Sequence, residues 1–177
     1  MTYSLAVLVL GSFTGVRIGV STIKAFNDVT NIPIASVSSL EGLAYNTLNE
    51  HSEYVLSIID AKNDNVYYGL FQKKNEKFFE VQPLGTKNIN GMIEMLKKYA
   101  NSKILFVGDG TIVHKNKLLQ NFKNADFIDA KHNIQTSASI GKAGFEHYKE
   151  GIYGDSNSLI PLYLRKSQAE RALEGEK

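Results

Sequence analysis

The segment Gly11–Gly19 constrains this chain more than any other part, because it reads Gly-Ser-Phe-Thr-Gly-Val-Arg-Ile-Gly directly after the apolar run Leu5–Leu10. That order predicts a strand buried on both faces, a glycine turn, and a helix over about Thr14–Asn27. Inside the helix, Gly15 and Gly19 each cost about 1 kcal/mol relative to alanine. Two such glycines on one helical face therefore indicate that another backbone packs closely there.

The spacing of these glycines excludes two nucleotide-binding motifs. A phosphate loop ends in Gly-Lys-Ser/Thr, and the dinucleotide motif has the spacing G-x-G-x-x-G; the segment has neither. Two interpretations remain open, namely a helix packed on its own sheet and a helix face that docks to a partner.

The composition narrows the classes of function. The chain has 177 residues, enough for one domain or two small lobes, and 43% of them are hydrophobic, so we expect a folded core. The 20 basic and 18 acidic residues give a net charge of +2, which offers no electrostatic case for a nucleic-acid surface. The absence of cysteine excludes disulfides and thiolate chemistry.

The histidines do not form a metal motif. His51, His114, His132 and His147 include no pair at the i, i+4 spacing of a helical zinc site, and no Ser-His-Asp arrangement is recognisable. We therefore expect surface histidines, no metal, no cofactor and no catalytic residue.

The N-terminal apolar run does not resemble a targeting segment. It lacks a basic region before it and a small-residue cleavage site, and it is too short to span a bilayer. We expect a cytoplasmic protein without a membrane contact.

The residues that follow predict a parallel α/β arrangement. A second strand is expected at Ile32–Val37, and Ser38 and Glu41 have the capping-box spacing of a helix that runs to about Glu50. Strand, helix, strand and helix in this order make up the expected first lobe, residues 1–50.

Residues 51–177 change in character and form the expected second lobe. The expected elements are an antiparallel meander of Tyr54–Asp60, Val66–Phe71 and Phe78–Val81, a helix at Ile89–Tyr99, a strand at Ile104–Val107, a helix at His114–Phe122, a short strand at Phe127–Asp129 and a helix at Ser137–Glu150. The whole pattern predicts an α/β fold of the ribonuclease-H-like, actin-type kind, built from two lobes.

Two polar turns permit an alternative, nucleotide-handling function. Asp60 ends a predicted strand, where an acid can position Mg²⁺ and phosphate, and the glycine turn Gly108–Gly110 follows another strand. Turn formation explains both features with fewer requirements. The nucleotide-binding interpretation stays open as the second hypothesis.

Four motifs in order along the chain resemble the TsaB (YeaZ) family. They are the glycine segment Gly11–Gly19, the run Ile32–Ile34 followed by Val37–Glu41, the hairpin Ile58–Lys62 with Val66–Tyr67, and the closing Pro161–Arg165 with Ala169–Glu170. The resemblance covers nearly the whole chain.

The resemblance implies an actin-like fold related to the sugar-kinase and Hsp70 ATPases. It also implies a role in making N6-threonylcarbamoyladenosine at adenosine 37 of tRNAs that read A-starting codons. In that role the protein is a non-catalytic scaffold that pairs with TsaD, while TsaE, an ATPase, joins the pair. Contact with tRNA is then indirect, and pairing with a second copy of the chain is an alternative.

In the family, the helix with the glycine signature contributes to the dimer surface. Carried over to this chain, the partner-binding residues are Phe13, Gly15, Val16, Gly19, Val20 and Ile23.

The chain departs from the family pattern at its beginning. Family members have an opening sheet and a helix before the signature strand, whereas this chain begins at that strand. We therefore expect a truncated first lobe without the opening sheet and first helix. A misplaced start codon is the alternative explanation, and a fragment without function is the third hypothesis.

Overall fold

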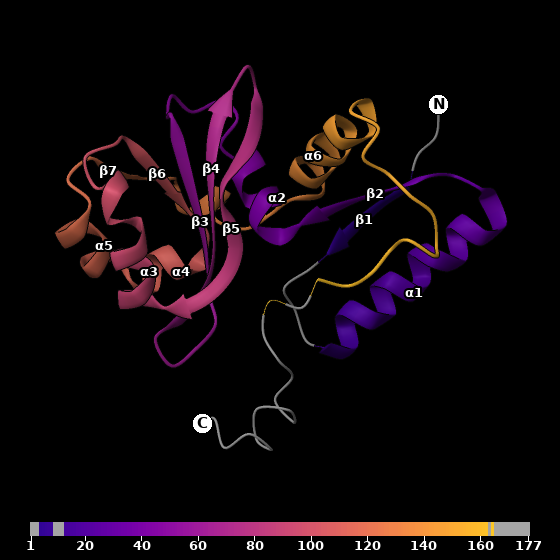
Figure 1. Ribbon diagram of the computed structural model, residues 1–177, viewed down its shortest axis with the longest axis horizontal. Helices are drawn as coiled ribbons and strands as arrows, with labels where there is room; N and C mark the ends of the chain where they lie inside the picture. The colour runs from indigo at the N-terminus through magenta and orange to yellow at the C-terminus, as the bar shows by residue number, and fades with distance from the viewer. Residues whose placement is uncertain (1–3, 9–12, 163, 165–177) are drawn as a thin grey trace.

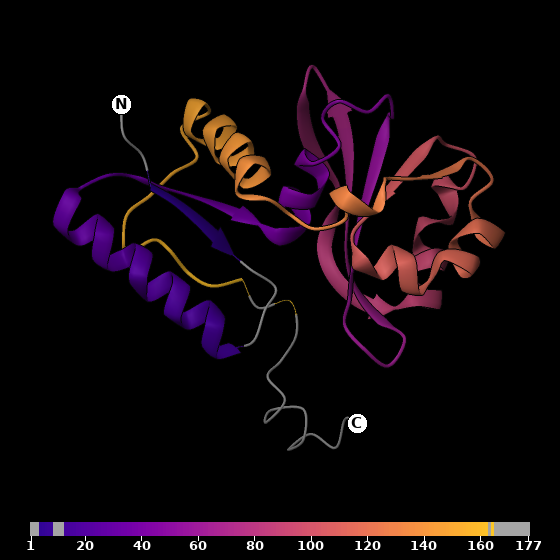
Figure 2. The ribbon, with the colours of Figure 1, turned by 180° about the vertical axis from the view of Figure 1, so that it is seen from behind.

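The computed structural model describes residues 4–8, 13–162 and 164, and Figures 1 and 2 show it from opposite sides. Its main elements are β1 (Ser4–Leu8), α1 (Phe13–Thr30), β2 (Ile34–Ser38), α2 (Ser39–Tyr45), β3 (Tyr54–Asp60), β4 (Asn65–Lys74), β5 (Lys77–Asn88), α3 (Ile89–Leu96), β6 (Ile104–Val107), α4 (Asp109–Val113), α5 (Lys115–Asn121), β7 (Ala125–Phe127) and α6 (Ser137–Lys149). Short 3₁₀ turns occur at Lys97–Tyr99 and Ala130–His132.

The smaller of two sheets joins β1 and β2 in parallel, with Ser4 opposite Ile34 and Leu8 opposite Ser38. Neighbouring parallel strands need a crossover connection, which α1 provides. On the other edge of β2, Ile34 forms an antiparallel bridge with Gly154. The chain therefore returns to this sheet late in the sequence.

The larger sheet has the strand order β5-β4-β3-β6-β7. Strands β3, β4 and β5 form the predicted antiparallel meander, while β6 and β7 run parallel to β3. The turn between β3 and β4 holds Lys62, Asn63 and Asp64 at φ of 66°, 52° and 58°. Asn and Asp tolerate this left-handed conformation better than most residues, which explains the turn signal in the sequence.

Strand β5 is far longer than the predicted Phe78–Val81. It extends to Asn88, opposite Asn65 of β4, and its register shifts on both sides of Leu70. Pro83 hides the strand pattern in the sequence, because proline cannot donate to a strand ladder. At the edge of a sheet this loss is tolerated, and β5 is an edge strand.

Several other boundaries differ from the prediction. The second helix ends at Tyr45 instead of about Glu50, the predicted helix at His114 begins at Lys115, the short strand is Ala125–Phe127 instead of Phe127–Asp129, and α4 was not predicted. Gly108, at φ 104°, turns the chain directly from β6 into α4, so the predicted glycine turn is also a helix start.

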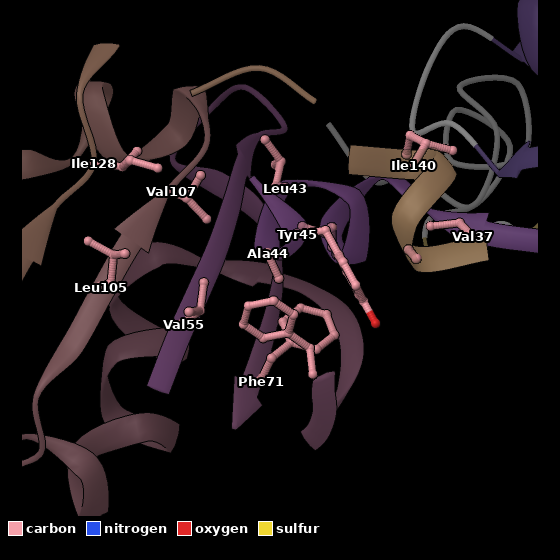
Figure 3. Packing of buried hydrophobic residues seen from close by; sticks show 13 residues of the cluster. Val37, Leu43, Ala44, Tyr45, Val55, Phe71, Leu105, Val107, Ile128 and Ile140 are labelled. Atoms are coloured by element: carbon pink, nitrogen blue, oxygen red, sulfur yellow. The ribbon is translucent and has the colours of Figure 1, made fainter. Parts of the chain in front are cut away.

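Helix α2 is shared between the two sheets. All of its residues except Glu41 are buried. Its apolar side chains pack with Val55 and Phe71 of the larger sheet and, on the other side, with Val37 of β2 and Ile140 of α6 (Figure 3). Ser38 accepts a hydrogen bond from the Glu41 amide at 3.0 Å and so caps the helix as predicted.

The outer helices complete the layers. Side chains of α3 and α5 pack with those on the second face of the larger sheet; they include Ile89, Met92, Ile93, Leu96 and Leu118. On the small sheet, α1 and α6 lie on opposite sides of β1 and β2 in both views (Figures 1 and 2). The predicted lobe boundary at residue 50 falls between α2 and β3. Helix α6, from the predicted second lobe, packs against α2, from the predicted first lobe. The division into lobes 1–50 and 51–177 stays a prediction.

Because α2 fills both cores, truncation of a buried side chain in it will destabilise the whole molecule. Leu40 is 0% exposed, and we expect Leu40→Ala to lower the free energy of unfolding by about 2–5 kcal/mol. Ile134→Ala is the matched control, since Ile134 is 72% exposed and a surface change moves stability by about 0.5 kcal/mol or less. Urea unfolding followed by circular dichroism measures both, and equal losses would contradict the assignment of a shared core.

Candidate functional site

Helix α1 turns one apolar face to its own sheet. Val20 is 7% exposed and packs against Ile34 and Leu159, with Val16 and Ile23 partly buried beside it. Their spacing of four and three residues is the predicted apolar stripe of an amphipathic helix. These contacts fix α1 on the small sheet.

The opposite side of α1 is apolar as well, although it faces solvent. We call the residues Gly15, Ile18, Gly19, Thr22, Phe26 and Val29, which helical spacing places on one side, the outer stripe. Ile18, Phe26 and Val29 are 63%, 57% and 83% exposed. A Cβ atom added at Gly19 would meet nothing within 4 Å. A surface helix ordinarily has a polar outer face, so an exposed apolar stripe of this length is unusual.

The C-terminal end of α1 is held by a buried side chain. Asn27 is 8% exposed; its amide donates to the Ile32 carbonyl at 2.9 Å, and its oxygen accepts from the Ser156 amide at 2.8 Å. Asn31, at φ 54°, then turns the chain out of the helix. The outer stripe therefore has a rigid base rather than a fraying helix end.

The structure divides the predicted partner-binding residues between the two faces of α1. Gly15 and Gly19 belong to the outer stripe, whereas Val16, Val20 and Ile23 face the small sheet. The side chain of Phe13, like residues 9–12, lies outside the described residues. Sequence reasoning missed Ile18, Phe26 and Val29, and the signal that would have found them is a second apolar stripe on the same helix. The role of the six predicted residues stays a prediction.

The two features behind the nucleotide-binding alternative lie side by side. The Asp60 amide donates to Asp109 Oδ1 at 3.0 Å. The Asp60 carboxylate accepts from the Lys62 amide at 3.0 Å and pairs with Lys62 Nζ at 2.9 Å. Burial raises the pKa of Asp60, but the bonds from Lys62 outweigh it and hold that pKa below its usual range. Both carboxylates thus have local structural roles, and the nucleotide-binding alternative stays a prediction.

The glycines of this turn are required by close packing on β3. A Cβ atom at Gly108 would collide with the backbone carbonyl oxygen of Ile58. A Cβ atom at Gly110 would lie 2.7 Å from Ile58 Cγ2 and 3.1 Å from the Asp60 amide nitrogen. The Gly108 amide also donates to Asn133 Oδ1 at 2.8 Å. The turn therefore holds α4 tightly against β3.

The expectation of surface histidines is wrong for two of the four. His114 is 5% exposed, with Nδ1 3.9 Å from Asp64 Oδ1. His147 of α6 has a side chain that is 20% exposed, and its Nε2 is 2.8 Å from Glu41 Oε1 of α2. Both partners are remote in sequence, so spacing alone could not reveal them.

Residues 4–8, 13–162 and 164 contain no group of three or more His, Asp or Glu able to hold a metal ion. No helix in the same ranges is long and apolar enough to cross a membrane.

Comparison with known proteins places the chain in a family. A family model described as TsaD, tRNA N6-adenosine threonylcarbamoyltransferase, matches residues 11–173. The chain is also 38% identical over 165 residues to the tRNA threonylcarbamoyladenosine biosynthesis protein TsaB of Bacillus subtilis, an alignment that covers 90% of this chain and 68% of the relative. The chain belongs to the TsaB family. The TsaB protein of Haemophilus influenzae is 23% identical over 171 residues, with 93% of this chain and 70% of the relative covered.

Solved structures of the TsaB (YeaZ) type have the same fold. YeaZ from Pseudomonas aeruginosa matches with a TM-score of 0.68 at 20% identity, over 87% of this chain and 70% of that one. A second structure from the same organism, described as similar to peptidase YEAZ, matches with a TM-score of 0.70 at 21% identity, over 88% and 69%. These matches confirm the predicted α/β fold of the actin-like type. The expected absence of an opening sheet and first helix stays a prediction.

Alanine substitutions at Gly108 and Gly91 distinguish the structural role of the Gly108 turn from the general effect of replacing a glycine on stability. We expect Gly108→Ala to lower the free energy of unfolding by more than about 1 kcal/mol, because φ is 104° and the β3 backbone occupies the space. Gly91→Ala in α3 is the control, since a Cβ atom there meets nothing within 4 Å and alanine favours a helix by about 0.5–1 kcal/mol. Thermal unfolding of both variants checks the opposite signs; a neutral Gly108 variant would contradict the packing role.

Proposed function

We propose that the chain acts in tRNA threonylcarbamoyladenosine biosynthesis as a non-catalytic subunit that pairs with a TsaD-type protein through the outer stripe of α1. The observation that carries the proposal is the exposed apolar stripe, with open space around Gly19, in a chain of the TsaB family. The curated relatives are named for this biosynthesis.

The outer stripe has the physical properties of an anchor. Gly19 has open space beside it, so that a partner helix can approach the backbone of α1 more closely there than a larger side chain would permit. Fully burying a side chain such as Ile18, Phe26 or Val29 contributes about 1.5–3 kcal/mol. Association itself costs about 4–15 kcal/mol, so we infer that the stripe anchors a larger interface and is not the whole of it.

The remaining parts of the role follow from the pairing. The chain supplies shape rather than chemistry, since the acids Asp60 and Asp109 are held by local hydrogen bonds. TsaE, the ATPase of the system, joins the pair, and tRNA is contacted through the partner, in keeping with a net charge of +2. The role places the chain in the cytoplasm with its tRNA substrates.

A bulky side chain in the outer stripe will prevent the pairing. We expect Gly19→Leu to weaken binding to the TsaD of the same organism at least tenfold, because the new side chain occupies the gap at the glycine while the fold has room for it. Isothermal titration calorimetry measures the affinity, and unfolding confirms the fold. Ser21→Leu is the matched control, since Ser21 is exposed on α1 but lies off the stripe. Equal affinities of the Gly19 variant and the parent would overturn the docking role.

Reconstitution tests the function itself. TsaD and TsaE are incubated with tRNA, ATP and a pre-activated threonylcarbamoyl donor, with and without the chain, and the modified nucleoside is quantified. We expect modification only when the chain is present, and none from the chain alone. Modification of equal extent without the chain would contradict the proposed function, and binding without modification would limit the role to docking.

A further inference from the structure

The last turn of α6 lies between the two sheets, and charged groups contact it from both sides. On one side, His147 reaches β2 and α2; on the other, Lys77 of β5 pairs with Glu150 Oε1 at 2.6 Å and with Glu146 Oε2 at 3.3 Å. The larger sheet is thereby tied to α6, which lies against the smaller sheet. These ion pairs and hydrogen bonds span the junction of the molecule's two halves.

His147 is bonded at both ring nitrogens, and both partners are acceptors. Nδ1 lies 2.9 Å from the Ser36 carbonyl oxygen, and Nε2 lies 2.8 Å from Glu41 Oε1. A carbonyl oxygen and a carboxylate accept hydrogen bonds only, so both bonds exist together only when the ring carries two protons and a positive charge. Loss of one proton leaves one of the two acceptors without its donor.

The Lys77 ion pairs lie beside a cavity where β5 faces α6. A cavity of about 320 Å³ lies there, lined by apolar groups that include Phe78 and Leu84 and by the charged groups just described. An unfilled volume removes the dispersion contacts that would otherwise hold two elements together. Lys77 therefore supplies a charged link between β5 and α6 at this cavity.

We propose that His147, Glu41 and Lys77 form an ionic clasp between the two halves of the molecule, and that loss of the His147 proton opens it. The cavity beside α6 is the space into which the clasp opens. Among the described residues, four carboxylates face His147 and Lys77: Glu41 from α2, Glu80 from β5, and Glu146 and Glu150 from α6. Tyr45 of α2 is neutral, and β1 and β2 carry no ionisable side chain. Lys149 of α6 also pairs with Glu146. Deprotonation thus leaves the four carboxylates with Lys77 and Lys149 as the positive groups paired among them, and Glu41 loses the charge of its partner.

The direction of the pH effect follows from the same contacts. The hydrogen bond that His147 donates to Glu41 raises the pKa of His147 above its usual 6.5, against the opposing effect of burial. A raised pKa in the folded state means that the clasp contributes fully below the ordinary histidine pKa and is lost as the pH rises through the raised one. The clasp is closed in mild acid and opens toward alkaline pH.

Spin labels on α6 and the β4–β5 hairpin test the opening directly, because the chain has no cysteine of its own. Cysteines replace the exposed Lys142 of α6 and Lys74 of β4, and pulsed electron resonance measures the distance distribution from about pH 5.5 to about pH 9. We expect the distribution to shift to longer distances as His147 titrates, with the titration followed by nuclear magnetic resonance. An unchanged distribution while His147 loses its proton would overturn the proposal.

Two substitutions separate the clasp from general pH effects. In Glu41→Gln we expect the His147 pKa to fall toward about 6.5, and the pH at the midpoint of the distance change to fall with it. A midpoint pH that stays in place while the His147 pKa moves would contradict the proposal. In His147→Gln the distance distribution no longer depends on pH, whereas His132→Gln, at an exposed histidine, behaves as the parent does. A pH response retained in a folded His147→Gln variant would also overturn it. If that variant does not fold, the Glu41→Gln comparison decides.

Discussion

The other contacts of this structure depend on the burial of α2 on two sides, because one short helix closes the core of the larger sheet and also receives α6 and β2. Because α2 is buried on two sides, almost none of its positions can hold a solvated polar side chain. Glu41 is its one residue that is not buried, and its carboxylate is paired with His147. The Glu41 side chain is only 15% exposed, and a charge so far withdrawn from water needs such a partner. The packing of α2 and the position of α6 are therefore set together.

Much of the framework was predictable from local patterns. Strand Ile104–Val107 was predicted with its observed bounds, and Ser38 was correctly placed as the cap of α2. Local patterns failed where a tertiary contact decides the structure. Strand β5 carries a proline that only an edge position permits, and the partners of His114 and His147 come from distant parts of the chain.

The candidate site shows the same division between local and tertiary information. Glycines at 15 and 19 predicted that another backbone packs closely on one side of α1, and this stays a prediction, because an exposed apolar side chain and a buried one look the same in a sequence. Only the position of Ile34 and Leu159 shows that Val20 points inward and that Ile18, Phe26 and Val29 point outward. A helix with apolar residues on two sides satisfies the prediction of packing and that of docking at once, so the two interpretations that the sequence left open are not exclusive.

The anchoring of α1 has a consequence for the order in which the chain becomes structured during synthesis. Its buried Asn27 is bonded to Ser156, 129 residues later, and Leu159 completes the contact of Val20. An emerging chain cannot form these contacts until Ser156 and Leu159 have left the ribosome, whereas the hairpin of β3 and β4 needs only its own neighbours. Helix α1 is made before the larger sheet but is secured after it, and its apolar side chains stay open to other molecules, chaperones included, until then.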